Sequence, residues 1–283
     1  MLWKGGREST NVEDRSGMTI GRGVVGGGIG TIVLILIGLF FGVDPRNIIN
    51  TGGYDSGVST NSPGTSRVDP RTKDFVSTIL GYTEDTWDNI FSQQGRTYRP
   101  PKLVLYSGET DTACGFGQAA MGPFYCPEDQ EVYLDTTFFQ ELRDRFGAPG
   151  EFAEAYVIAH EIGHHVQNQL GIAEQANAAQ NRSSKTQANA ISVRVELQAD
   201  CLAGVWASNT QRREQAKGNG FLETGDVEQA LNAASMIGDD KLQKRAQGYV
   251  VPESFTHGTA AQRVHWFKAG FDGGTIASCN TFQ

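Results

Sequence analysis

The chain has 283 residues, of which 39% are hydrophobic and 20% are charged, so it can bury a substantial core without help from metal or disulfides. Its formal net charge is -8 at pH 7 and its isoelectric point is about 5.2. Because binding to phosphate groups needs a basic face, this acidity argues against nucleic acid as a partner.

The most apolar segment of the chain, residues 24–43, reads VVGGGIGTIVLILIGLFFGV and contains no charged side chain. It is long enough to cross a bilayer as a helix, and glycines are common in membrane spans. A cleaved signal peptide is the alternative interpretation, but the polar region ahead of the segment is long and no small-residue cleavage site follows it. We therefore predict an uncleaved transmembrane helix at residues 24–43.

Positive charges are distributed unevenly around this segment. Four precede it and two follow within a comparable distance: Lys4, Arg7, Arg15 and Arg22 against Arg46 and Arg67. The positive-inside rule then predicts that residues 1–23 form a cytoplasmic N-terminal segment and that the rest of the chain is periplasmic or extracellular. The sequence therefore predicts a single-pass membrane protein.

Residues 44–71 are rich in glycine, serine, threonine, asparagine and proline, which is typical of a flexible linker. Residues 72–283 contain no internal repeat and are predicted to form one domain. Apolar residues at helical spacing predict helices at Lys73–Phe91, Asp135–Phe146, Glu151–Leu170, about Ile191–Thr210 and Asp226–Ile237. Short runs of β-forming residues predict strands at Leu103–Tyr106 and Glu131–Leu134. This order predicts an α+β fold, a mostly helical domain with a small β-sheet.

The four cysteines all lie on the predicted outer side of the membrane. An even number there favours two disulfides, and three connectivities are possible. Cys114 and Cys126 could close a short loop, and Cys201 with Cys279 would then pin the C-terminal tail to a helix. Free buried thiols are the alternative. A cysteine-based zinc site is not expected, because the chain has no C-x₂-C spacing.

The run His160–His165 reads HEIGHH and matches H-E-x-x-H within the predicted helix Glu151–Leu170. Residues i and i+4 share a helix face, so His160 and His164 can bind one zinc ion. Glu161 can then take a proton from a water and pass one to a leaving amine. His165 lies about 100° around the helix from His164 and is not expected to bind the same ion.

A catalytic zinc needs a third protein ligand, and the next long helix offers Glu196 and Asp200, again four residues apart. If the two helices pack antiparallel, Glu196 can bind zinc while Asp200 accepts a hydrogen bond from His160 or, alternatively, His164. A solvated helix face that also carries Arg194 is the competing interpretation. Small residues would let the helices approach closely: Gly163, Ala199, Ala203 and Gly204.

Peptide hydrolysis also needs a donor for the developing oxyanion. His257, in the segment THGT, is the first candidate, and His265 and Tyr156 are weaker ones. Arg263 could instead be the structural partner of a carboxylate. The strand Glu131–Leu134 could be an edge strand that pairs with an extended substrate, or an internal strand.

Four longer segments carry a family resemblance: HEIGHHVQNQLG (160–171), VELQADCLAGVWA (195–207), GPFYCPEDQEVYLD (122–135) and SFTHGTAAQR (254–263). With the opening MLWKGGRESTNVEDRSG, they resemble the bacterial neutral zinc metallopeptidase family over essentially the whole chain except the linker. The resemblance implies a single-pass membrane protein whose outer domain is a zincin-like peptidase with a glutamate as the third zinc ligand. It implies the same site residues as the spacing does, namely His160, Glu161, His164 and Glu196.

The sequence therefore predicts an endopeptidase of the cell envelope that uses one catalytic Zn²⁺ and acts on peptides or proteins. One alternative is a non-catalytic, zinc-stabilised binding or scaffold domain, although an intact Glu161 would have no role there. Another is hydrolysis of a non-peptide amide, such as one in the cell wall, which a small closed pocket would favour.

Overall fold

The computed structural model of the chain describes residues 1–17, 68–118, 122–135 and 137–283. The predicted transmembrane helix at 24–43 lies outside these residues, as does most of the predicted linker. Within the described residues, no helix combines the length and the apolar character needed to cross a membrane.

A four-stranded sheet with the order β1-β2-β6-β5 forms the β part of the domain. β1 (Val12–Asp14), β2 (Lys102–Tyr106) and β6 (Glu131–Asp135) are parallel, and β5 (Phe124–Cys126) runs antiparallel to β6. Both predicted strands are confirmed. β6 is internal, however, so its suggested role as an edge strand is wrong, and β5 is the sheet edge next to it. A separate hairpin joins β3 (Glu109–Thr112) to β4 (Gly115–Gln118).

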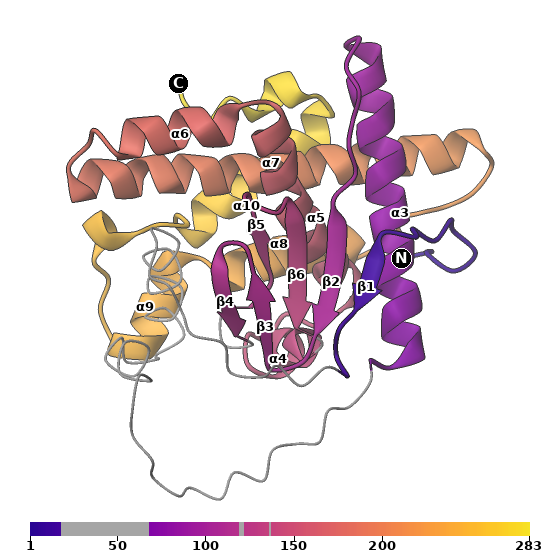
Figure 1. The fold of residues 1–283 in the computed structure, drawn as a ribbon, viewed down its shortest axis with the longest axis horizontal. Coiled ribbons are helices and arrows are strands. Elements are labelled where there is room, and N and C mark those ends of the chain that lie inside the picture. Colours follow the sequence, from indigo (N-terminus) through magenta and orange to yellow (C-terminus); the bar gives the residue numbers. More distant parts are fainter. Residues whose placement is uncertain (18–67, 119–121, 136) are drawn as a thin grey trace, which may run out of the picture.

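Eight α-helices lie in the described part of the chain, which confirms the mixed α+β class. They are α3 (Pro70–Gln93), α4 (Phe138–Asp144), α5 (Glu151–Gln169), α6 (Ile172–Gln180), α7 (Lys185–Ala216), α8 (Asp226–Met236), α9 (Asp239–Gln247) and α10 (Ala260–Gly273). Figure 1 shows α6 and α7 lying across one end of the strands and α3 standing beside β1.

The helix boundaries differ from prediction where polar residues obscure the pattern. α4 begins only at Phe138, because Asp135 ends β6 and does not cap the helix. α7 begins at Lys185, where Ser184 and Gln187 form a capping box, and α6 was not predicted at all. Alanine, glutamine and asparagine dominate α6, so it lacks the apolar spacing that identifies a helix in sequence.

The core joins α5 to α7. Phe152 of α5 stacks on Trp206 of α7, with ring centroids 6.1 Å apart, and Phe221 packs edge-on against both rings. The predicted disulfide pairs, Cys114–Cys126 and Cys201–Cys279, are both present. The second ties α7 to the short helix η3 (Ile276–Cys279) at the end of the chain.

The N-terminal residues belong to this fold. Trp3 is only 6% exposed and packs edge-on against Phe75 of α3, and β1 extends the sheet beside β2. The prediction of a separate segment over residues 1–23 is therefore wrong for residues 1–17. The predicted linker boundary at residue 71 is also too late, because Val68 is buried and α3 starts at Pro70.

Candidate active site

The candidate site residues lie where α5 and α7 pack antiparallel, as the order of their contacts shows. Phe152 meets Trp206, His160 meets Asp200, and Gln167 meets Val195 and Gln198. A Cβ atom on Gly163 would lie 3.0 Å from the Ala199 carbonyl oxygen, so glycine permits this close contact as predicted. Gly204 serves a different contact, because its missing side chain makes room for the backbone of Phe267 in α10.

The structure brings the three predicted zinc ligands together. The Nε2 atom of His160 lies 3.1 Å from Oε2 of Glu196, and Nε2 of His164 lies 3.5 Å from Oε1 of Glu196. One ligand atom from each residue lies within 4.8 Å of the other two. Two imidazoles and a carboxylate around one point make a donor set typical of a catalytic zinc site.

Hydrogen bonds fix how His160 faces this point. Its Nδ1 lies 2.8 Å from Oδ1 of Asp200, as predicted, and a carboxylate can only accept, so Nδ1 carries the proton. The Nε2 lone pair of a neutral His160 then faces Glu196 Oε2, which is also an acceptor. Two acceptors at this separation need a shared proton or a cation between them, and a zinc ion would fill that role.

A different side chain orients His164. Its Nδ1 lies 2.9 Å from Oε1 of Gln167, and the Gln167 amide donates to the Val195 carbonyl and to Oε1 of Gln198. These two donated bonds establish which end of the amide faces His164. Asp200 is thus not the partner of His164. Sequence reasoning missed Gln167, although its i+3 position after His164 was the available signal.

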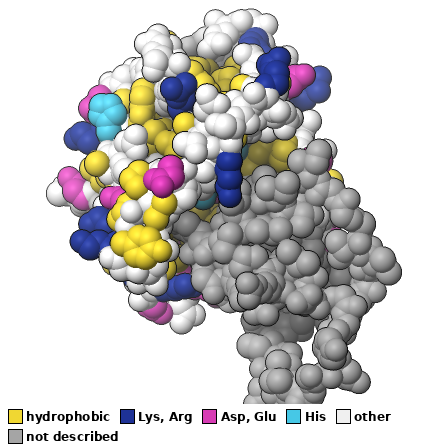
Figure 2. Space-filling model, turned by 90° about the vertical axis from the view of Figure 1, so that its left-hand side faces the viewer, with side chains coloured by type: hydrophobic (Ala, Val, Ile, Leu, Met, Phe, Trp, Pro, Cys, Tyr) yellow, Lys and Arg dark blue, Asp and Glu magenta, His cyan; other side chains and the backbone are white. Residues whose placement is uncertain are grey.

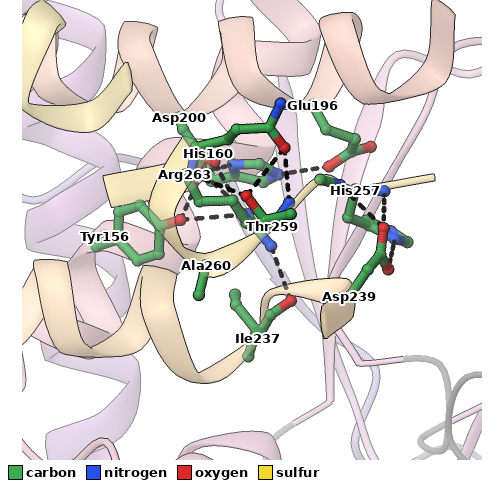
Figure 3. A network of polar contacts seen from close by, with 12 residues as sticks. Tyr156, His160, Glu196, Asp200, Ile237, Asp239, His257, Thr259, Ala260 and Arg263 are labelled. Carbon is green, nitrogen blue, oxygen red and sulfur yellow. Dashed lines mark hydrogen bonds and ion pairs between the residues drawn. The ribbon is translucent and has the colours of Figure 1, made fainter. Parts of the chain in front are cut away.

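Asp200 is the centre of a buried ionic network, shown in Figure 3. Arg263 of α10 donates Nε to Oδ2 at 2.8 Å and Nη2 to Oδ1 at 2.9 Å, and the Tyr156 hydroxyl donates to Oδ1. Asp200 is fully buried, which would raise its pKa, but Arg263 and His160 lower the pKa to about 2. Arg263 is therefore the partner of a carboxylate, as the sequence suggested. The Tyr156 hydroxyl is already bonded to Asp200 in this network.

The electrostatic balance of the site favours a cation. Burial opposes a charged His160, but the carboxylates of Asp200 and Glu196 overcome it and raise the pKa of His160 to about 10. Burial likewise opposes a charged Glu196, yet His164 and His257 hold the pKa of that carboxyl well below its usual range. Glu161 is also buried beside the two histidines, and burial is the main reason that its pKa is raised.

His257 lies beside Glu196, with Asp239 on its other side (Figure 3). Oδ2 of Asp239 accepts the backbone N–H groups of Thr256, His257 and Gly258 at 2.7–2.9 Å, and its Oδ1 is 3.5 Å from Nδ1 of His257. Asp239, the first residue of α9, thus holds the loop that carries His257. Sequence reasoning missed this role, because the two residues are far apart in the chain. His265 is exposed on α10 and does not join the ligand set.

His165 has a structural position. Its ring is 1% exposed, with Nδ1 3.1 Å from the Tyr125 hydroxyl and Nε2 2.7 Å from the Arg99 carbonyl oxygen. It therefore ties α5 to the edge strand β5 and to the segment before β2. Burial lowers the pKa of His165 to about 4.

This lowered pKa predicts acid sensitivity. Between the unfolded pKa of 6.5 and the folded pKa of about 4, His165 is protonated in the unfolded chain but neutral in the folded one. The free energy of unfolding therefore falls as the pH falls through this range. We expect His165→Gln to remove on the order of 3 kcal/mol of that pH dependence while leaving zinc content unchanged. Urea unfolding of both proteins at pH 7 and pH 4 measures the difference. Equal pH dependence would contradict the assignment.

A cavity of about 390 Å³ adjoins the His257 loop. It lies between the N-terminal half of α7, the short helix η2 (Pro252–Ser254) and α10, and its apolar lining includes Val193, Leu197, Phe255 and Trp266. A Cβ atom on Gly258 would lie 3.2 Å from both Val193 and Leu197, so the cavity wall touches the loop that carries His257. Figure 2 shows hydrophobic side chains exposed among polar and charged ones on the face that it views.

Comparison with known proteins identifies the family of the chain. Residues 1–282 match the family described as "Putative neutral zinc metallopeptidase". The chain belongs to this family. It is 48% identical over 291 residues to the uncharacterized protein YpfJ of Escherichia coli K12, covering 100% of this chain and 99% of the relative. It is 38% identical over 254 residues to the uncharacterized protein Rv2575 of Mycobacterium tuberculosis, covering 87% and 85%. No solved structure matches the chain.

Proposed function

We propose that the chain is a zinc-dependent endopeptidase of the cell envelope, with a zincin-like catalytic domain. The observation that carries the proposal is the convergence of His160, His164 and Glu196 on one point, with the carboxylate of Glu161 on the same helix as the two imidazoles. The family described for this chain supports zinc peptidase chemistry in general. The two disulfides support an oxidising compartment.

Each residue has a role in this proposal. A zinc ion held by His160, His164 and Glu196 would supply a Lewis acid that polarises the scissile carbonyl and eases deprotonation of a water. Glu161 takes the proton from the attacking water and delivers a proton to the amine nitrogen as the peptide bond breaks. His257, held by Asp239, donates a hydrogen bond to the oxygen that gains negative charge.

An extended substrate is supported by the position of β5. This strand is the edge of the sheet and packs against α5, which carries Glu161 and the two histidines. The unpaired backbone groups of an edge strand can hydrogen-bond to a peptide in extended conformation. A non-catalytic zinc domain, the alternative, would leave Glu161 without a role, because a structural zinc site needs no base.

The 390 Å³ cavity is the proposed site for an apolar substrate side chain. The variant Val193→Trp would fill part of this space. We expect it to lower kcat/KM by about tenfold for peptides that place leucine or phenylalanine in the cavity, compared with peptides that place alanine there. Profiling a mixed peptide library measures this ratio. Gln215→Trp, at an exposed site near the end of α7, is the control. An unchanged preference would remove the cavity from the substrate site.

The proposed activity is tested with the full chain and a mixed peptide library analysed by mass spectrometry. We expect cleavage by the zinc-loaded protein, loss of cleavage after chelation, and recovery when zinc is restored. A protein that binds zinc and cleaves no peptide in the library would favour the non-catalytic alternative.

A further inference from the structure

We propose that residues 1–17 lie on the same side of the membrane as the catalytic domain, as a permanent part of its fold. The positive-inside rule predicted the opposite, a cytoplasmic segment separated from an outer domain. The proposal concerns topology and does not depend on the proposed peptidase activity. Backbone pairing, a buried carboxylate, a glycine in α3 and the ion pairs of two arginines support it.

Backbone hydrogen bonds join the N-terminal segment to three parts of the domain. The Leu103 amide of β2 donates to the Asn11 carbonyl at 2.9 Å, and the Arg15 amide donates to the Leu105 carbonyl at 2.8 Å. The Ser9 amide bonds to α3 and the Leu2 amide bonds to the Phe221 carbonyl, at 2.9 and 2.8 Å. Between the first two bonds, Val12–Asp14 pair in register with Leu103–Leu105. The segment is thus a strand of the sheet.

A buried carboxylate of α3 depends on this segment. Glu84 is 8% exposed, and its two oxygens accept hydrogen bonds from three side chains of residues 7–11. These donors are Arg7 Nη2 at 2.8 Å, Ser9 Oγ at 2.5 Å and Asn11 Nδ2 at 2.8 Å. If the segment were elsewhere, Glu84 would lose all three of these bonds, and leaving a charged group unpaired at such a site is costly.

Gly81 gives an independent indication from the sequence itself. Glycine in a helix interior is less favourable than alanine, yet Gly81 lies in the middle of α3. A Cβ atom there would overlap the carbonyl oxygen of Arg7. The N-terminal segment crosses α3 at this point, and this close contact explains why the position is a glycine.

The arginines that suggested a cytoplasmic segment have partners in the domain. Arg7 pairs with Glu84 at 2.8 Å and with Asp85 at 2.7 Å, and Arg15 Nη2 lies 3.5 Å from Glu131 of β6. These two charges therefore stabilise the fold through ion pairs, and they are weaker evidence for membrane orientation. Two parts of one packed domain cannot lie on opposite sides of a bilayer, so residues 1–17 lie on the same side as the sheet and helices that they contact.

Cysteine labelling tests the topology directly in the full chain. Thr10→Cys and Lys268→Cys each add one thiol at an exposed position, and the four native cysteines are held in disulfides. A membrane-impermeant maleimide is added to intact spheroplasts and, in parallel, to lysed ones. We expect the two positions to be labelled alike in both samples, and labelling of both before lysis would place them outside. Labelling of one position before lysis and of the other only afterwards would overturn the proposal.

Gly81→Ala tests the packing without reference to a membrane. If residues 1–17 are docked, the added methyl group displaces the segment, and we expect Tm to fall by roughly 5 °C or more. If α3 were uncovered at this position, alanine would raise Tm, because it is the better helix former. Asp88→Ala, at an exposed position of the same helix, is the control and should change Tm little. A rise in Tm for Gly81→Ala would overturn the proposal.

Discussion

Replacing Glu161 with glutamine is expected to abolish peptide cleavage while leaving zinc bound. The amide has almost the same size as the carboxylate, but it cannot take a proton from the attacking water. General base catalysis contributes about 10²–10⁴-fold to such reactions, so we expect kcat/KM to fall by a factor in that range. Zinc content measured by atomic absorption should be unchanged, because Glu161 is not among the ligands.

The matched control for this variant is Glu151→Gln at the start of the same helix. Glu151 pairs with Arg71 at the surface, at 2.7 Å, so its replacement tests the loss of a carboxylate from α5 away from the site. It should retain full activity. Cleavage at the wild-type rate by Glu161→Gln would mean that another group serves as the base.

Replacing Asp200 with alanine is expected to have the largest effect on stability. The change leaves the Arg263 guanidinium, which is only 2% exposed, without its carboxylate partner and removes the acceptor for Nδ1 of His160. Breaking a buried ion pair in this way costs about 3–5 kcal/mol, and losing the bond that orients a metal ligand lowers metal affinity about 10–100-fold. Urea unfolding and competitive zinc titration measure the two effects.

Two further variants separate these effects. Asp144→Ala removes an exposed aspartate of α4 and should change neither stability nor zinc affinity. The double replacement Asp200→Leu with Arg263→Met removes both charges, so it should recover much of the stability without recovering zinc affinity. If the double variant bound zinc normally, Asp200 would have no role in orienting His160.

Local sequence patterns were sufficient to predict most of the candidate ligand set. His160 and His164 follow from four-residue spacing on α5, and Glu196 and Asp200 repeat that spacing on α7. The antiparallel packing of α5 and α7 then brings the two pairs together as expected. The helix predicted over Glu151–Leu170 also ends as expected, because Gly171 adopts a φ of +76° that favours glycine.

Contacts between distant segments could not be read from such patterns. Asp239 holds the His257 loop through backbone N–H groups, and no spacing in the sequence links the two. β1 has only three residues and pairs with a strand about 90 residues later, so it gives no periodic signal of its own. The carboxylate partners of the N-terminal arginines lie in α3 and β6, and sequence spacing does not reveal them for the same reason.

The zinc content of the wild type and of Glu196→Ala, measured on the same preparations by competitive titration, tests the site most directly. We predict one tightly bound zinc ion per wild-type chain and an affinity lowered by more than about 100-fold in the variant, since a ligand is lost outright. Glu253→Ala, which removes a carboxylate from the cavity next to the site, should bind zinc like the wild type. Equal zinc affinity in the wild type and Glu196→Ala would contradict the assignment of His160, His164 and Glu196 as the metal centre.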